Sequence, residues 1–159
     1  MQFSRYRLIL ILLFSLLFVD LLVNSISGLF SDDDVAALIL YIVQDVCLVI
    51  DVIVLFLIFF NTYVFKAGLV SVIIRKFKST IVVSLLYLGL CLAYHIWSLR
   101  RQWGKSDVYI WNAGVQALFV IQRLVGVAYY YSYLKTMLKL GDEKYYRNSD
   151  WLKKEFSNR

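Results

Sequence analysis

The sequence predicts an all-α integral membrane protein, a bundle of four transmembrane helices. Four long apolar stretches fill most of the 159 residues, and nearly all charged residues lie between them or beyond the last one. Each stretch approaches or exceeds the ~20 residues with which a helix crosses a bilayer. Composition agrees, because 61% of the residues are hydrophobic and the mean hydropathy is +0.70. Helices of a soluble bundle would each need a polar face. We therefore expect a single transmembrane domain, residues 1–159.

The expected spans are residues 8–30, 35–60, 81–99 and 108–138. The first span follows Arg5 and Arg7, as the apolar region of a signal peptide follows its basic region. A small-residue cleavage site does not follow; instead Asp20 and Asn24 appear and the apolar run resumes. We therefore expect the first span to be a retained signal anchor.

The connector between the second and third spans, residues 62–78, has an amphipathic pattern. Its apolar residues recur near one helical face, and the basic residues Lys66, Arg75, Lys76 and Lys78 lie elsewhere. Such a pattern is typical of a helix lying in the membrane interface, and it equally suits a continuation of the second span. In the tail, residues 141–159, Trp151 and Phe156 are apolar enough to dock on the membrane or on a neighbour. These basic and aromatic residues are the expected cytoplasmic contacts with anionic lipid or a partner. Gly141 is a plausible C-terminal cap for the fourth helix.

Orientation follows from the basic residues of the short loops. With four spans, the N-terminus, the second loop and the tail share one side, which carries twelve basic residues against three on the other side. Both termini are therefore predicted to be cytoplasmic. The formal net charge of +6 then describes a basic rim that faces anionic lipid, and a nucleic-acid surface is not expected.

Polar residues inside the spans are the candidate site. Ionisable groups in hydrocarbon cost ~2.5–3.5 kcal/mol on insertion scales, so each needs a partner, water or a function. The candidates are Asp20, Asn24, Gln44, Asp45, Gln122 and Arg123. We expect Arg123 to face the interior and to pair with Asp20 or Asp45, and the network to fix helix register or to hold a partner helix. Asp51 lies about 240° around the second helix from Asp45, so it should face elsewhere. Tyr129, Tyr130, Tyr131 and Tyr133 are expected in an interfacial aromatic belt.

Catalysis and cofactor binding have little support. The chain has no Walker motif, HExxH or Gly-x-Ser-x-Gly. Cys91 and His95 are spaced to share a metal, but two ligands without an evident third make a very weak site. We expect no catalytic residue, no cofactor and no metal ligand.

Several stretches, in order along nearly the whole chain, resemble the transmembrane protein 138 family. They are DLLVNSIS (20–27), IVQDV (42–46), FFNTYVFKAGLV (59–70) with KFK (76–78), FVIQRL (119–124), LGD (140–142) and WLKKEF (151–156). Asp51 and Lys66 stand where the family pattern has neutral residues. The resemblance implies a small four-span protein of the cilium and the membrane at the ciliary base or associated vesicles, without enzymatic activity. It offers no catalytic or ligand residues to carry over.

Three functions remain open at this stage. The leading hypothesis is a non-enzymatic scaffold or trafficking factor for cilium assembly and ciliary membrane composition. It would act by helix–helix contacts in a transition-zone complex, through the faces carrying Asp20 and Asn24 or Gln122 and Arg123. The alternatives are a small channel or transporter that uses the intramembrane Asp and Arg residues, and a chaperone whose clients are ciliary receptors.

Overall fold

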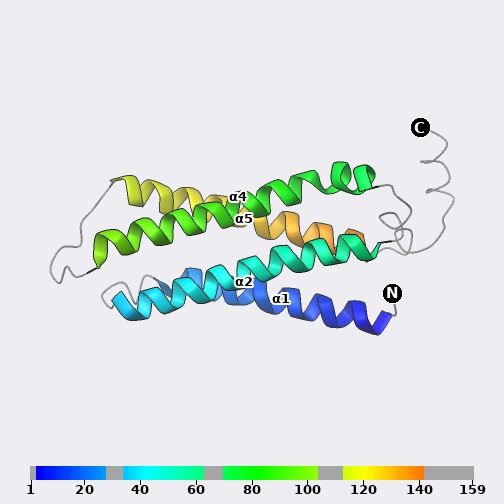
Figure 1. Ribbon diagram of the computed structural model, residues 1–159, viewed down its shortest axis with the longest axis horizontal. Helices are drawn as coiled ribbons and strands as arrows, with labels where there is room; N and C mark the ends of the chain where they lie inside the picture. The colour runs from blue at the N-terminus through cyan, green and yellow to red at the C-terminus, as the bar shows by residue number, and fades with distance from the viewer. Residues whose placement is uncertain (1–2, 28–33, 63–69, 104–112, 142–159) are drawn as a thin grey trace.

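The computed structural model describes residues 3–27, 34–62, 70–103 and 113–141. These residues form an antiparallel bundle of two helical hairpins (Figure 1). The helices are α1 (Phe3–Ile26), α2 (Asp34–Asn61), α4 (Val70–Gln102) and α5 (Ala113–Leu140). The start of α1, the end of α2, the start of α4 and the end of α5 lie at one end of the bundle (Figure 1). We call this the basic end, because Arg75, Lys76, Lys78 and Lys139 belong to it, and we call the other the distal end.

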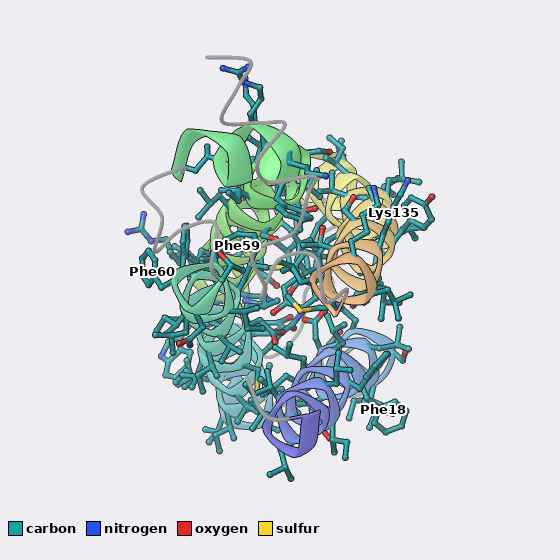
Figure 2. All side chains as sticks on the ribbon, turned by 90° about the vertical axis from the view of Figure 1, so that its right-hand side faces the viewer. Phe18, Phe59, Phe60 and Lys135 are labelled. Carbon is teal, nitrogen blue, oxygen red and sulfur yellow. The ribbon has the colours of Figure 1, made fainter. Side chains whose placement is uncertain are left out.

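All four helices are long and apolar enough to cross a membrane. The candidate spans are Leu8–Ile26, Asp34–Asn61, Ile74–Arg101 and Ala113–Leu140. Large apolar side chains point outward on every helix, among them Phe18 and Phe60, while Phe59 turns inward (Figure 2). A surface of this kind is stable in hydrocarbon and not in water. The predicted fold class is confirmed, and the orientation of the termini stays a prediction.

Polar groups close the helix ends where intrahelical partners run out. At the end of α2, the backbone N and the hydroxyl of Thr62 both donate hydrogen bonds to the Phe59 carbonyl, at 3.1 and 2.7 Å. At the end of α5, Gly141 N donates to the Met137 carbonyl at 3.1 Å, in the place expected for a C-terminal cap. The lone acid of the first turn of α2, Asp34, lies where the helix dipole favours negative charge.

The described part of the second connector, residues 70–78, belongs to the third span and matches neither alternative that the sequence left open. Residues 63–69, with Lys66, lie outside the described part, but residues 70–78 form the beginning of α4 and run without a break into the third span. Phe77 is buried there and stacks on Phe59, with ring centroids 5.4 Å apart, whereas Arg75, Lys76 and Lys78 remain exposed. Phe77, one member of the apolar face of this segment, thus packs on α2.

The expected tyrosine belt is wrong for two of its four members. Tyr129 and Tyr133 are buried in the core, Tyr130 is half-buried, and Tyr131 is exposed. Tyr129 stacks on Tyr87 of α4, with ring centroids 4.8 Å apart. The two rings fit because α5 has Gly126 beside them: a Cβ there would lie 3.2 Å from Tyr87 Cε2. A tyrosine buried in this way needs a hydrogen-bond acceptor for its hydroxyl.

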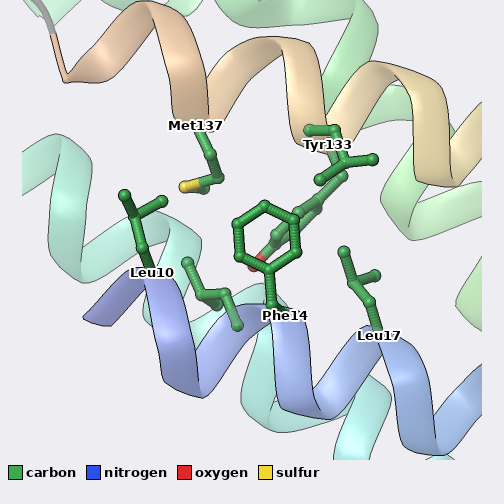
Figure 3. A pocket seen from close by; sticks show the side chains of 7 residues that line it. Leu10, Phe14, Leu17, Tyr133 and Met137 are labelled. Carbon is green, nitrogen blue, oxygen red and sulfur yellow. The ribbon is translucent and has the colours of Figure 1, made fainter. Parts of the chain in front are cut away.

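A shallow recess lies between α1 and α5 toward the basic end (Figure 3). Its lining is apolar and consists of Leu10, Leu13, Phe14, Leu17, Tyr133, Leu134 and Met137. Its volume of about 10 Å³ is near the smallest space that holds one water molecule. The recess is therefore a packing defect between two helices and too small for an organic ligand.

Candidate functional site

Asp20 and Asn24 of α1 form the centre of a buried polar network. They stand four residues apart on one helical face, as the sequence pattern predicts, and are 0% and 7% exposed. Gln44 of α2 donates from Nε2 to Asp20 Oδ1 at 2.7 Å and to Asn24 Oδ1 at 3.1 Å. This fixes the register of the first hairpin, because a slip of either helix would leave the amide and the carboxylate unpaired in hydrocarbon.

The second hairpin supplies two phenols and an amide to the same centre. The Tyr87 hydroxyl of α4 donates to Asp20 Oδ2 at 3.0 Å, and Tyr130 of α5 donates to the same oxygen. Asn24 Nδ2 in turn donates to the Tyr87 hydroxyl at 2.7 Å. Gln122 Nε2 donates to Asn24 Oδ1 at 3.1 Å and contacts Cys91 Sγ at 3.3 Å. The network therefore joins all four helices and gives both carboxylate oxygens of Asp20 hydrogen-bond donors.

Arg123 faces the interior, as expected, but its partner is different. Its guanidinium donates to the backbone carbonyl of Asn24 and lies over the Phe119 ring, 4.8 Å from the centroid. The expected ion pair with Asp20 or Asp45 is thus replaced by a bond to the last turn of α1, where carbonyls lack intrahelical partners. A cation there is also favoured by the helix dipole.

Asp45 does not share the partners of this network. Its Oδ1 lies 2.9 Å from His95 Nδ1 of α4, within hydrogen-bond distance. His95 is buried and stacks on Tyr41, with ring centroids 4.2 Å apart and an interplanar angle of 12°. The sequence grouped Asp45 with Gln44 in one network and offered it as one of two partners for Arg123. That grouping is wrong because neighbouring residues on a helix, such as Gln44 and Asp45, point about 100° apart.

Asp51 forms a second polar centre, in the middle of α2. It is fully buried, and the Tyr129 hydroxyl donates to its Oδ2 at 3.3 Å. The Tyr133 hydroxyl donates to its backbone carbonyl at 2.8 Å. The sequence correctly separated Asp51 from Asp45, yet it gave no indication that Asp51 faces the core.

The residues that sequence reasoning missed are mostly tyrosines. Tyr87 and Tyr130 bind Asp20, and Tyr129 binds Asp51, but a tyrosine in an apolar run was read as part of the span or of the interface. A usable signal exists, since a phenol in mid-span must find an acceptor and an aspartate is the strongest one available. Lys66, Trp151 and Phe156 lie outside the described residues.

Chemically, the network is suited to holding helices together. Asp20 is saturated with donors, and Asn24 uses both amide atoms and its carbonyl. Within the described residues, no three His, Cys, Asp or Glu side chains gather as a metal site would require. In this network Gln122 Oε1 is buried without a hydrogen-bond partner among the described atoms.

Four apolar helices with a polar core that links them define a polytopic α-helical membrane protein. The chain belongs to the transmembrane protein 138 family, whose model matches residues 37–155. It is 45% identical to transmembrane protein 138 of Mus musculus over 98% of this chain and 96% of that protein. The corresponding protein of Xenopus tropicalis is 44% identical over 99% and 97% of the two chains, and that of Danio rerio is 41% identical over the same shares. No solved structure matches the chain.

Proposed function

We propose that this protein is a non-enzymatic membrane scaffold or trafficking factor that acts through helix–helix contacts with other membrane proteins. The observation that carries the proposal is the polar network, whose donors and acceptors are used almost entirely between the protein's own four helices. Residues that move an ion or proton would need a hydrated path beside them. The recess between α1 and α5 is apolar and holds about 10 Å³, which favours a structural role for the network.

The partner surface differs from the one that the sequence suggested. The faces carrying Asp20, Asn24 and Gln122 are buried inside the bundle, so they are already occupied by the protein's own helices. α5 is the better candidate for the partner-binding helix. It has the lowest hydropathy of the four candidate spans, and the smallest share of its residues is buried inside the bundle. Its outward side chains include Leu124, Val127 and Tyr131, exposed by 67%, 68% and 65%. Partner helices in a bilayer recognise such a face by close packing.

The cellular setting is proposed from the family. Membership in the transmembrane protein 138 family, together with the resemblance described above, supports a place at the ciliary base and in vesicles that supply the cilium. The partners would be other membrane proteins there, with ciliary receptors as a possible client class. Arg75, Lys76 and Lys78, exposed at the basic end, supply charge for anionic lipid on the cytoplasmic side.

Mild-detergent purification of the tagged protein from ciliated cells, combined with proximity labelling, tests the proposal. We expect ciliary-base membrane proteins to co-purify with the chain. Val127→Trp on α5 should reduce that capture, while Val46→Trp, a matched substitution at an exposed site on α2, should leave it intact. A lone particle that conducts ions in proteoliposomes would contradict the scaffold and favour transport.

The orientation has its own test. Antibody labelling of a C-terminal tag should require permeabilised cells, because the tail is predicted to be cytoplasmic. Labelling of intact cells at the surface would invert the topology and move the basic end to the opposite side.

A further inference from the structure

Asp51 presents one carboxylate oxygen that lacks a donor. Tyr129 donates to Oδ2, but Oδ1 is buried without a hydrogen-bond partner in the part of the chain that the structure describes. The Ser84 hydroxyl of α4 is 2% exposed and likewise has no partner among the described atoms. Buried polar groups of this kind are rare, and each calls for an explanation, such as a bound ion or water.

The register of α4 and α5 places these two groups at the same level of the core. Thr80 and Tyr87 of α4 both face the core, because Thr80 bonds to α5 and Tyr87 bonds to Asp20 of α1. Ser84 lies between them, about one helical turn from each, and so shares their face of the helix. Tyr87 stacks on Tyr129, and the Tyr129 hydroxyl reaches Asp51. Ser84 lies one turn from Tyr87 toward the basic end, which is the level of Tyr133, and Tyr133 also bonds to Asp51. Asp51 and Ser84 therefore lie at one level of the core, and within the described residues no hydrogen bond joins Asp51 Oδ1 to Ser84 Oγ.

Among the described residues, no cationic side chain pairs with Asp51. Arg123 is engaged by the Asn24 carbonyl, and His95 by Asp45. Within the described residues, Asp51 has no ion-pair partner. A carboxylate in a dry interior stays ionised only where a positive charge compensates it, and otherwise it takes up a proton.

We propose that the Asp51 layer is a binding site for a monovalent metal cation of the Na⁺ class. Its ligands would be Asp51 Oδ1, Ser84 Oγ and the hydroxyl oxygens of Tyr129 and Tyr133, which keep lone pairs while they donate to Asp51. Oxygen donors are what hard cations prefer. One carboxylate balances one positive charge, whereas a divalent ion would leave an excess charge in hydrocarbon. The site goes beyond the scaffold role, and its failure would leave that proposal standing.

The test is the thermal unfolding of the purified full chain in detergent as NaCl replaces choline chloride at constant ionic strength. A ligand that binds only the folded state raises the unfolding midpoint in a saturable way. We expect such a rise for the wild type, and we expect Asp51→Asn to abolish it. Ser84→Ala keeps the carboxylate and should weaken the apparent Na⁺ affinity about tenfold, the scale typical of losing one supporting contact.

Asp45→Asn is the matched control, since it removes a neighbouring α2 carboxylate that has His95 as its partner. It should keep the full sodium-dependent rise. The proposal would be overturned if the unfolding midpoint of the wild type did not change with Na⁺ concentration. It would also be overturned if the midpoint rose equally in the wild type and in Asp51→Asn. A response to pH that is independent of Na⁺ would also overturn it, because the layer would then bind a proton.

Discussion

The two buried aspartates, Asp20 and Asp51, are equally inaccessible but differ in their surroundings. Asp20 receives an amide and two phenols from three other helices, so both of its oxygens are hydrogen-bonded. Asp51 receives one phenol at 3.3 Å, and its Oδ1 has no partner among the described atoms. Burial alone therefore does not identify a structural carboxylate. The number of donors that reach it decides whether its charge holds the fold together or is available to a ligand.

The largest effect should come from Asp20→Leu. The substitution leaves the Gln44 amide and the Tyr87 and Tyr130 hydroxyls without their acceptor, which should cost about 3–5 kcal/mol of unfolding free energy, as when one partner of a buried charged group is removed. Unfolding by SDS titration in mild detergent, followed by circular dichroism, measures this change. Ser15→Ala is the control on α1, because the Ser15 hydroxyl bonds only its own helix at an exposed site. Equal stability of the two variants would contradict a structural role for Asp20.

A smaller loss is expected for Gln44→Ala. Gln44 Nε2 is shared between Asp20 and Asn24. After its removal Asn24 Oδ1 keeps the Gln122 donor, whereas Asp20 keeps donors to Oδ2 and its Oδ1 loses the bond from Gln44. The loss should be about 1–2 kcal/mol, within the range for a buried hydrogen-bonding group. The same SDS titration measures it, and a double variant with Asp20→Leu should lose less than the two single losses added together. Strict additivity would show that the two side chains do not act as one network.

Gly126→Ala tests the tight packing of the tyrosine stack that lies between the two aspartates. The new Cβ would lie 3.2 Å from the Tyr87 ring, and that ring is held by Tyr129 on one side and by Asp20 through its hydroxyl. We expect a loss of about 1 kcal/mol from overpacking. Gly89→Ala is the matched control on α4, because its Cβ would meet nothing within 4 Å; there the helix should gain about 0.5 kcal/mol. Effects of the same sign at both glycines would contradict the tight packing at Gly126.

The smallest effect should come from Asp51→Asn, and its sign should be opposite to that at Asp20. In sodium-free buffer the neutral amide avoids the cost of a poorly paired buried charge, so the variant should equal or exceed the wild type by up to about 1 kcal/mol. The gap should close as Na⁺ is added, because the cation stabilises only the wild type. A loss as large as that of Asp20→Leu would show that Asp51 is structural in the same sense as Asp20.

Sequence reasoning located most members of the Asp20 network but assigned several partners incorrectly. Asp20, Asn24, Gln44 and Gln122 were found because a polar residue in an apolar run is conspicuous. Asp45 was grouped with them because it is adjacent to Gln44. Arg123 was paired with an aspartate because the two side chains carry opposite charges. The tyrosines were missed because a phenol in a span looks apolar or interfacial until an acceptor is placed beside it.

By itself the sequence determined the fold class, the four spans and the existence of a buried polar centre. These follow from length, hydropathy and the cost of charge in hydrocarbon, which are properties of each segment alone. Only the tertiary structure decided that Asp45 bonds His95, that Arg123 binds a backbone carbonyl, and that Asp51 faces Tyr129 and Tyr133. Such pairings depend on the rotation and relative height of each helix. These are set jointly by core packing such as the fit of Tyr87 against Gly126, and one segment's sequence does not contain them.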